Sequence, residues 1–246
     1  YTARQGFPVE IQAQWVRACR ELEKLAQRLN HTELAERAKK AGDECSEQIQ
    51  TRFWCQETQY PYDCLESGVD NTDSIGDASI RPNALIALAT APEIFPGRLA
   101  EEIVNRVEEH LLTERGIRSL DPRSPRYIGH CGDTLEERRA ASHQGTVWAH
   151  LLLYYVRARL ALRPDDAEWL TDLVVELVRS SRALGYIAQS ADGDSPHQLR
   201  GSPTYALATA LILEVLVDDL GIASREDLLF SGDASEQPSH LSSPAS

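Results

Sequence analysis

The sequence has no methionine and begins with Tyr1. Since translation starts at methionine, it is predicted to be a segment of a longer product. It also lacks any apolar run of the roughly 20 residues that a membrane-spanning helix requires. Arg4, Pro8 and Glu10 interrupt any apolar core of a signal peptide near the start. The sequence therefore predicts neither a membrane partner nor a secretion signal.

Cysteine is scarce and shows no paired spacing. Such a pattern excludes a disulfide framework and a zinc knuckle, and it predicts reduced thiols in a cytoplasmic protein. The five cysteines are Cys19, Cys45, Cys55, Cys64 and Cys131.

Basic residues are also in short supply. The 25 Lys and Arg residues face 38 Asp and Glu residues, which gives a net charge of -13 and a pI of about 5.0. Such a chain repels phosphate backbones and anionic lipid surfaces on average, so no nucleic-acid partner is predicted. The sequence has no Gly-rich phosphate loop and no GxSxG elbow, and it predicts no cofactor and no serine nucleophile.

A metal site has little support. The candidate ligands are His130, Cys131, His143 and His150. His143 and His150 are seven residues apart on one predicted helix face, but no paired ligand motif accompanies them. The sequence therefore predicts no metal.

Hydrophobic residues, at 42% of the chain, recur mainly at helical spacing. Seven helices are predicted, paired in sequence, with almost no strand beyond a short one near Tyr62–Leu65 and a loop or hairpin over 116–133. No repeat of fixed length is present, so an ordinary solenoid is not expected. The predicted helices span about 8–29, 30–53, 82–91, 99–111, 144–162, 165–184 and 205–220.

One globular unit is predicted over residues 1–230, followed by a disordered tail over 231–246. The tail is rich in Ser, Pro, Asp and Glu and has little to bury.

Two polar clusters are predicted at helix starts. In the sequence DASIRPN, Arg81 and Asn83 can hold hydroxyls or an anion, or the segment is simply a helix start with Pro82 in its first turn. In SHQGTVW, His143, Gln144 and Trp148 bring an imidazole, a carboxamide and an indole together. This set suits a sugar, although a buried Trp beside a satisfied His is the alternative.

A third cluster lies in GYIAQSADGDSPHQLRG, residues 185–201, which Gly and Pro prevent from being helical. It contains Asp192, Asp194, His197 and Arg200. Long loops between buried helices are often functional. The alternative is an acidic surface turn, in which Asp-Gly supplies the turn geometry.

Together these motifs resemble the glucosidase domain of glycogen debranching enzymes. YTARQGFPVEIQAQW is similar to the segment that follows the family's catalytic-acid motif. DASIRPNALIAL, LLTERGIRSLDPRSPRYIGH, ASHQGTVWAHLL and DGDSPHQLRG match further family motifs in the family's order. The resemblance covers about residues 2–216.

The resemblance implies an amylo-α-1,6-glucosidase domain with an (α/α)6 barrel of helical hairpins. Its substrate would be the single α-1,6-linked glucose left on a trimmed glycogen branch. Family members invert the anomeric centre with two carboxyl groups, an acid for the leaving oxygen and a base for the attacking water.

The chain departs from the family pattern at both catalytic positions. The family's acid, an Asp in a Trp-Met-Asp motif, belongs upstream of Tyr1. Its base, a Glu three residues before Asp-Gly-Asp, corresponds to Gln189, and a carboxamide cannot accept a proton from water near neutral pH. Asp192 or Asp194 would be the substitute if the alignment slips. Tyr205 stands where the family has a Gln-Ala-Trp run.

The sequence thus predicts an all-α protein, a partial (α/α)6 toroid with long loops at one end. Seven helices are too few for a ring of twelve, so an apolar face is expected around Leu151 and Leu211, where the missing N-terminal part of the parent protein would pack.

The predicted partner is an α-glucan, glycogen or a maltodextrin branch. One hypothesis is an enzyme segment that supplies the sugar-binding half of the site, and the other is a non-catalytic glucan-binding or scaffold module. Besides Gln189 at the base position, the predicted substrate-binding residues are Arg81, Asn83, His143, Gln144, Trp148, Asp192 and Asp194.

Overall fold

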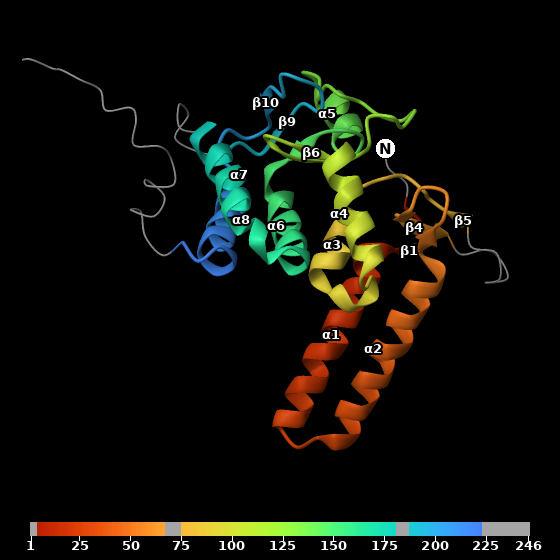
Figure 1. The fold of residues 1–246 in the computed structure, drawn as a ribbon. Coiled ribbons are helices and arrows are strands. Elements are labelled where there is room, and N and C mark those ends of the chain that lie inside the picture. The colour runs from red at the N-terminus through yellow and green to blue at the C-terminus, as the bar shows by residue number, and fades with distance from the viewer. Residues whose placement is uncertain (1–3, 67–74, 181–186, 223–246) are drawn as a thin grey trace, which may run out of the picture.

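The computed structural model describes residues 4–66, 75–180 and 187–222 (Figure 1). This part of the chain is mainly helical, as the sequence predicts, but it is not all-α, because it also contains three small sheets. The α-helices are α1 (Val9–Arg28), α2 (Thr32–Arg52), α3 (Asn83–Thr90), α4 (Arg98–His110), α5 (Leu135–Ala141), α6 (Leu152–Leu162), α7 (Ala167–Ser180) and α8 (Ala206–Glu214). Three 3-10 turns are Pro92–Ile94, Ala149–Leu151 and Pro164–Asp166, and a π-helical turn over Val215–Asp219 continues α8.

Three small antiparallel sheets accompany the helices. One contains β1 (Phe7–Pro8), β4 (Cys64–Glu66) and β5 (Ile75–Gly76), and a second pairs β2 (Trp54–Cys55) with β3 (Tyr60–Pro61). The third has the order β10-β9-β8-β7-β6. Its strands are β6 (Leu112–Thr113), β7 (Gly116–Arg118), β8 (Val147–Trp148), β9 (Ser190–Ala191) and β10 (Leu199–Arg200).

The helices pack around α6. It contacts α3, α4, α7 and α8, while α1 packs against both α2 and α3. The helix predicted over 99–111 is present as α4, and its apolar residues Ile103 and Val107 are buried at 0% exposure. Such interdigitated burial is the main source of stability for helices of this length.

The five-stranded sheet lies at one end of the helices, together with α5, whereas the α1–α2 hairpin projects from the opposite end (Figure 1). Antiparallel pairing joins segments that are far apart in the chain. Val147 lies opposite Ala191, and Trp148 lies opposite both Ile117 and Ser190. The sheet therefore brings the long connections between the helices together at one end of the molecule.

The sequence predicts one helix over 144–162, and this prediction is wrong at its start. Val147 and Trp148 form β8, a 3-10 turn follows, and α6 begins only at Leu152. Gly145 has a φ of 146°, which no helix accommodates. The cluster SHQGTVW consequently enters a strand, and the 185–201 segment includes β9 and β10.

Two further boundaries differ from the sequence prediction. The helix predicted from Asn30 begins at Thr32, because Asn30 adopts a φ of 58° in the turn, and His31 precedes the helix without a side-chain cap. The helix predicted over 205–220 is present as α8 with its π-helical turn. The predicted tail over 231–246 lies outside the described residues.

Exposed apolar side chains gather on α1 and on the last helical segment. Ile11, Trp15 and Leu25 are 49%, 57% and 53% exposed. Leu213 and Val217 are 59% and 47% exposed. The apolar face predicted around Leu151 is not found there, since Leu151 packs into the core at 7% exposure. It lies on these two helical surfaces instead.

Candidate functional site

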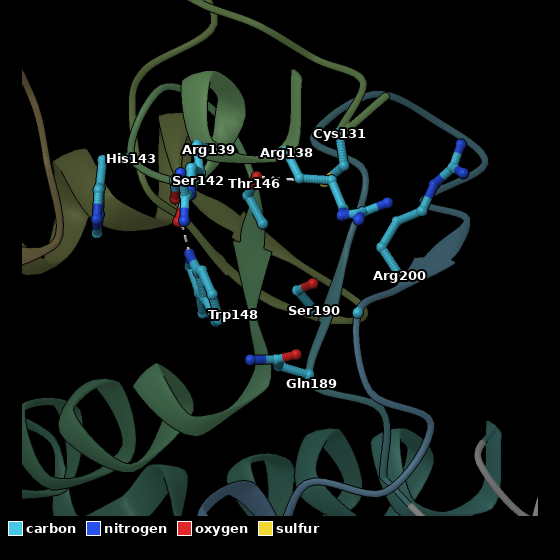
Figure 2. Close-up of a pocket in the computed structure, with 11 residues that line it drawn as sticks. Cys131, Arg138, Arg139, Ser142, His143, Thr146, Trp148, Gln189, Ser190 and Arg200 are labelled. Atoms are coloured by element: carbon cyan, nitrogen blue, oxygen red, sulfur yellow. Dashed lines mark hydrogen bonds between the residues drawn. The ribbon is translucent and has the colours of Figure 1, made fainter. Parts of the chain in front are cut away.

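Two neighbouring cavities open beside β8, and His143 and Trp148 line both of them. The first, here called the sheet cavity, has a volume of about 510 Å³ and is drawn in Figure 2. The second, here called the helix-end cavity, measures about 520 Å³ and lies beside the start of α3. The other side chains of interest around the sheet cavity are Cys131, Arg138, Arg139, Gln189, Ser190 and Arg200. Those around the helix-end cavity are Arg4, Glu10, Arg81, Asn83, His150 and Tyr205.

Trp148 is held in place by the sheet and by one hydrogen bond. Its backbone pairs with Ile117 on one side and Ser190 on the other, and its indole Nε1 donates to the Ser142 carbonyl at 3.0 Å (Figure 2). The indole also meets the His150 ring edge-on, with centroids 5.6 Å apart. A half-buried indole between two cavities offers an apolar surface for stacking.

Gln189 lines the sheet cavity immediately before β9. Its side-chain Oε1 accepts a hydrogen bond from the Ser202 amide at 2.9 Å, and its backbone amide donates to the Ser202 carbonyl. Gly201 has a φ of 72°, and a Cβ built there would lie 2.5 Å from Gln189 Oε1. Within the described residues, the Nε2 group of Gln189 has no hydrogen-bond partner. This amide donor therefore remains available to a ligand.

Arg81 and Gln144 bind each other. Both side chains are buried, and Arg81 donates to Gln144 Oε1 at 2.9 Å, to the Ser119 carbonyl at 3.2 Å and to the His143 carbonyl. Burial together with other positive charges lowers the pKa of Arg81, although Asp63 and Asp77 oppose this. The pair joins the start of α3 to the loop before β8.

A cluster of charges and amides lies at the back of the helix-end cavity. Arg4 Nε is 2.8 Å from Asp63 Oδ2, and Asn83 Nδ2 donates to Asp63 Oδ1 at 2.7 Å. Burial raises the pKa of Asp63, and the Arg4 charge opposes that shift. Glu10 lines the cavity but accepts two hydrogen bonds from Arg4, at 2.6 and 2.8 Å.

The pKa values of the two cavity histidines are both lowered, which favours their neutral forms. Burial lowers the pKa of His150, whose Nδ1 lies buried between the rings of Trp148 and Tyr205 and has no hydrogen-bond partner among the described residues. Desolvation and the charge of Arg81 also lower the pKa of His143, which stands at the cavity mouths. Neutral imidazoles donate and accept hydrogen bonds, as sugar hydroxyls do.

Asp192 and Asp194 connect loops. Asp192 is 3% exposed and accepts from Arg200 Nε at 3.0 Å, from Arg200 Nη2 at 2.9 Å and from the Cys131 amide at 2.9 Å. Burial opposes its ionisation, but these hydrogen bonds hold the pKa of Asp192 below its usual value. Asp194 is exposed and accepts from the Tyr127 hydroxyl at 3.0 Å.

The predicted site residues fall into two groups. The cavities are lined by Arg81, Asn83, His143, Trp148 and Gln189. Their linings do not include Gln144, Asp192 or Asp194, which bind neighbouring protein groups. The role of each in ligand binding stays a prediction.

Sequence reasoning missed several lining residues. Glu10, His150 and Tyr205 lie in or beside the family motifs, but the sequence assigned none of them a sugar-binding role. Arg138 and Arg139 are adjacent arginines that a charge survey of the 116–142 segment would have found. Among the residues described, no group of three His, Cys, Asp or Glu side chains is arranged to hold a metal ion. Nor does that part of the chain contain a helix long and apolar enough to span a membrane.

The profile of the family described as amylo-alpha-1,6-glucosidase matches residues 1–214. The chain belongs to the amylo-alpha-1,6-glucosidase family. The resemblance seen in the ordered motifs is thereby confirmed. Over 88 residues the chain is 33% identical to the glycogen debranching enzyme of Saccharomyces cerevisiae, an alignment that covers 33% of this chain and 6% of that protein.

Solved structures from Thermus thermophilus share the fold. An uncharacterized conserved protein aligns with a TM-score of 0.56 at 18% identity, over 84% of this chain and 45% of that one. A GH63 mannosylglycerate hydrolase in complex with glucose aligns with a TM-score of 0.55 at 18% identity, over 84% and 47%. At such identities the likeness shows the fold alone. The chain spans about half the length of these proteins.

Proposed function

We propose that this amylo-alpha-1,6-glucosidase family chain binds α-glucan through the sugar-binding part of a glycosidase site, and that by itself it does not cleave the glucan. The observation that supports this is the position of Trp148, which lines two neighbouring cavities together with hydrogen-bonding side chains such as His143, Asn83 and Gln189. An aromatic plane with hydrogen-bonding side chains around it suits the apolar face and the hydroxyls of a sugar ring.

In the proposed complex, the apolar face of a glucose ring stacks on Trp148. Asn83 and His143 meet hydroxyls from the helix-end side, and the free Nε2 of Gln189 meets them from the sheet side. The cavities, at about 510 and 520 Å³, are each large enough for a sugar ring.

Gln189 supports the absence of hydrolysis. An inverting glycosidase needs a carboxylate to activate water, and the position that the family resemblance assigns to this base carries an amide. Glu10 is a carboxylate in the helix-end cavity, but both of its oxygens are bound by Arg4. Since both oxygens already accept hydrogen bonds from Arg4, this carboxylate is not positioned to take a proton from water.

We further propose that the fold is part of an (α/α)6 toroid and that other helices of the same domain cover the exposed faces of α1 and α8. The exposure of Trp15 and Leu213 supports this, because soluble proteins rarely leave such side chains clustered in water. In the alternative function, the assembled domain is a debranching glucosidase. The family match supports that alternative, and Gln189 opposes it.

Titration of the chain with maltotetraose, followed by NMR or calorimetry, tests the binding proposal. We expect millimolar or tighter binding, and Trp148→Leu should weaken it about fivefold, because the lost stacking contributes about 1 kcal/mol. Trp15→Leu is the matched control on α1 and should bind as the unaltered chain does. No detectable binding, or the same affinity in Trp148→Leu, would reject the site.

Glucose release from a phosphorylase limit dextrin tests the second part of the same proposal. We expect no release from the chain. Gln189→Glu should also be inactive alone, because a general base does not cleave the glycosidic bond without a general acid to protonate the leaving oxygen. Robust release by the unaltered chain would contradict the assignment of Gln189.

A further inference from the structure

We infer that the sheet cavity holds an anionic group on a bound sugar, a carboxylate or a phosphate, through Arg138 and Arg139. The inference rests on the proposed sugar binding at Trp148 and extends it to the class of ligand. Titration with neutral and anionic sugars distinguishes a failure of anion binding from a failure of sugar binding.

The charge of the sheet cavity is opposite to that of the chain. Acidic residues outnumber basic ones by 38 to 25 overall, yet among the described residues this cavity is lined by Arg138, Arg139 and Arg200 and by no Asp or Glu side chain. Figure 2 shows Arg138, Arg139 and Arg200 along one side of the cavity, with Trp148 and Gln189 on the other. A sugar stacked on the indole would thus present a substituent toward the arginines.

Arg200 is not free to bind such a group. Its guanidinium makes two hydrogen bonds to Asp192 and approaches Asp133 at 3.5 Å. The charge of Arg200 is therefore balanced by carboxylates of the protein, and this side chain lines the cavity without binding the anion.

Arg138 and Arg139 differ from Arg200 because neither forms an ion pair within the described part of the chain. Arg138 donates only to the Asp133 carbonyl, and the nearby Glu137 carboxylate accepts from the backbone amides of Asp133 and Thr134. Two guanidinium groups thus line the cavity without forming an ion pair, although, after the hydrogen bonds from Thr134, the charge of Arg138 contributes to the lowered pKa of Glu137. The side chains of both arginines are exposed and accessible to a ligand.

The backbone fixes where these arginines stand. The capping box between Thr134 and Glu137 starts α5, and both arginines occupy its last turn, where the helix dipole favours cations. The Cys131 thiol in the same wall stays protonated, because burial raises its pKa. No competing anion is therefore supplied by the cavity itself.

Guanidinium groups bind carboxylate and phosphate through paired N–H donors with charge assistance. A neutral glucan would use hydroxyl contacts and would gain little from two guanidiniums that form no ion pair in the described part of the chain. Two classes of ligand carry such an anionic group on a sugar ring. A uronic acid carries it as a carboxylate, and a sugar phosphate carries it as a phosphate.

The experiment titrates the full chain with maltose, glucuronate, glucose 6-phosphate and inorganic phosphate at low and high salt. We expect the anionic sugar of the correct class to bind about tenfold tighter than maltose at low salt, since hydrogen bonds to charged groups are the stronger ones. The advantage should shrink as salt screens the charges. The stronger of the two anionic sugars identifies the source.

The Arg138→Gln/Arg139→Gln variant should bind the anionic sugar only as well as maltose, with maltose affinity unchanged. Arg98→Gln is the control, because the Arg98 side chain on α4 is 80% exposed and lies outside both cavities. Arg139→Gln alone removes no hydrogen bond that the structure shows, so it tests the idea if the double variant fails to fold.

Equal binding of anionic and neutral sugars would overturn the inference while leaving sugar binding intact. So would retention of the anion preference in the variants. Binding of inorganic phosphate alone, with no sugar bound, would overturn the claim that the anion is carried by a sugar. If maltose and both anionic sugars fail to bind, the proposed function fails, and this inference fails with it.

Discussion

The α1–α2 hairpin and the region around the five-stranded sheet are built in opposite ways. The hairpin consists of two uninterrupted helices of 20 and 21 residues joined by a short turn. The sheet assembles strands of two or three residues that are drawn from positions 112 to 200. A local pattern forms the first region, and long-range pairing forms the second.

The two regions also differ in how deeply their charged and polar groups are buried. In the hairpin, the pairs Arg17–Glu21 and Lys39–Asp43 are exposed at i,i+4 spacing, where such bonds contribute little. Around the sheet, Asp192 and the Arg81–Gln144 contact are buried, so each group depends on its partner. Polar substitutions should consequently be tolerated in the hairpin and costly near the site.

The largest expected difference concerns apolar packing. Leu85→Ala in α3, at 0% exposure, should cost about 2–5 kcal/mol of unfolding free energy, because it leaves a cavity. Leu25→Ala in α1, at 53% exposure, should change it little. Urea denaturation of both variants measures this. A comparable loss in Leu25→Ala would show that the outer face of α1 is covered in the isolated chain.

Asp192→Asn should have the next largest effect. It removes the charge that accepts from Arg200 and the Cys131 amide, and the expected loss is about 2 kcal/mol, since Arg200 can still reach water. The control is Asp43→Asn in the hairpin, whose bonds to Arg20 and Lys39 are exposed. Chemical denaturation should show a lower midpoint only for Asp192→Asn. Equal midpoints would mean that the Asp-Gly-Asp turn does not depend on this ion pair.

The smallest expected effect is a pH dependence from His150. Burial keeps the folded pKa of His150 below the ordinary value of about 6.5, so the unfolded state takes up a proton first as the pH falls. Stability should decrease from pH 7.5 to 6.0, by less than about 1.4 kcal/mol per pH unit for one group. His150→Gln should flatten this slope, and His31→Gln in the hairpin turn should leave it unchanged. An identical slope in all three proteins would assign the dependence to other groups.

The site residues could be predicted in part. The motif SHQGTVW contains His143 and Trp148, and DASIRPN contains Arg81 and Asn83. All four line the cavities, and their binding of a ligand stays a prediction. The short strand predicted near Tyr62–Leu65 overlaps β4. The strands of the five-stranded sheet could not be predicted individually, because two or three residues are too few to show an alternation of apolar and polar side chains. The helix predicted from Gln144 failed for that reason, since β8 exists through its partners in β7 and β9.

The sequence by itself determined most of the helices and the family, although it did not predict α5 or the start of α6. An apolar stripe such as Ile103 and Val107 specifies its own helix. The order of the family motifs along the chain can be read without knowledge of the fold. Tertiary structure alone decided whether each polar residue meets a ligand or another side chain. Arg81 and Gln144 lie 63 positions apart and bind each other, whereas Arg138 and Arg139 line a cavity and form no ion pair among the described residues. The physical reason is that a hydrogen bond or ion pair depends on distance and burial in space, which local composition does not contain.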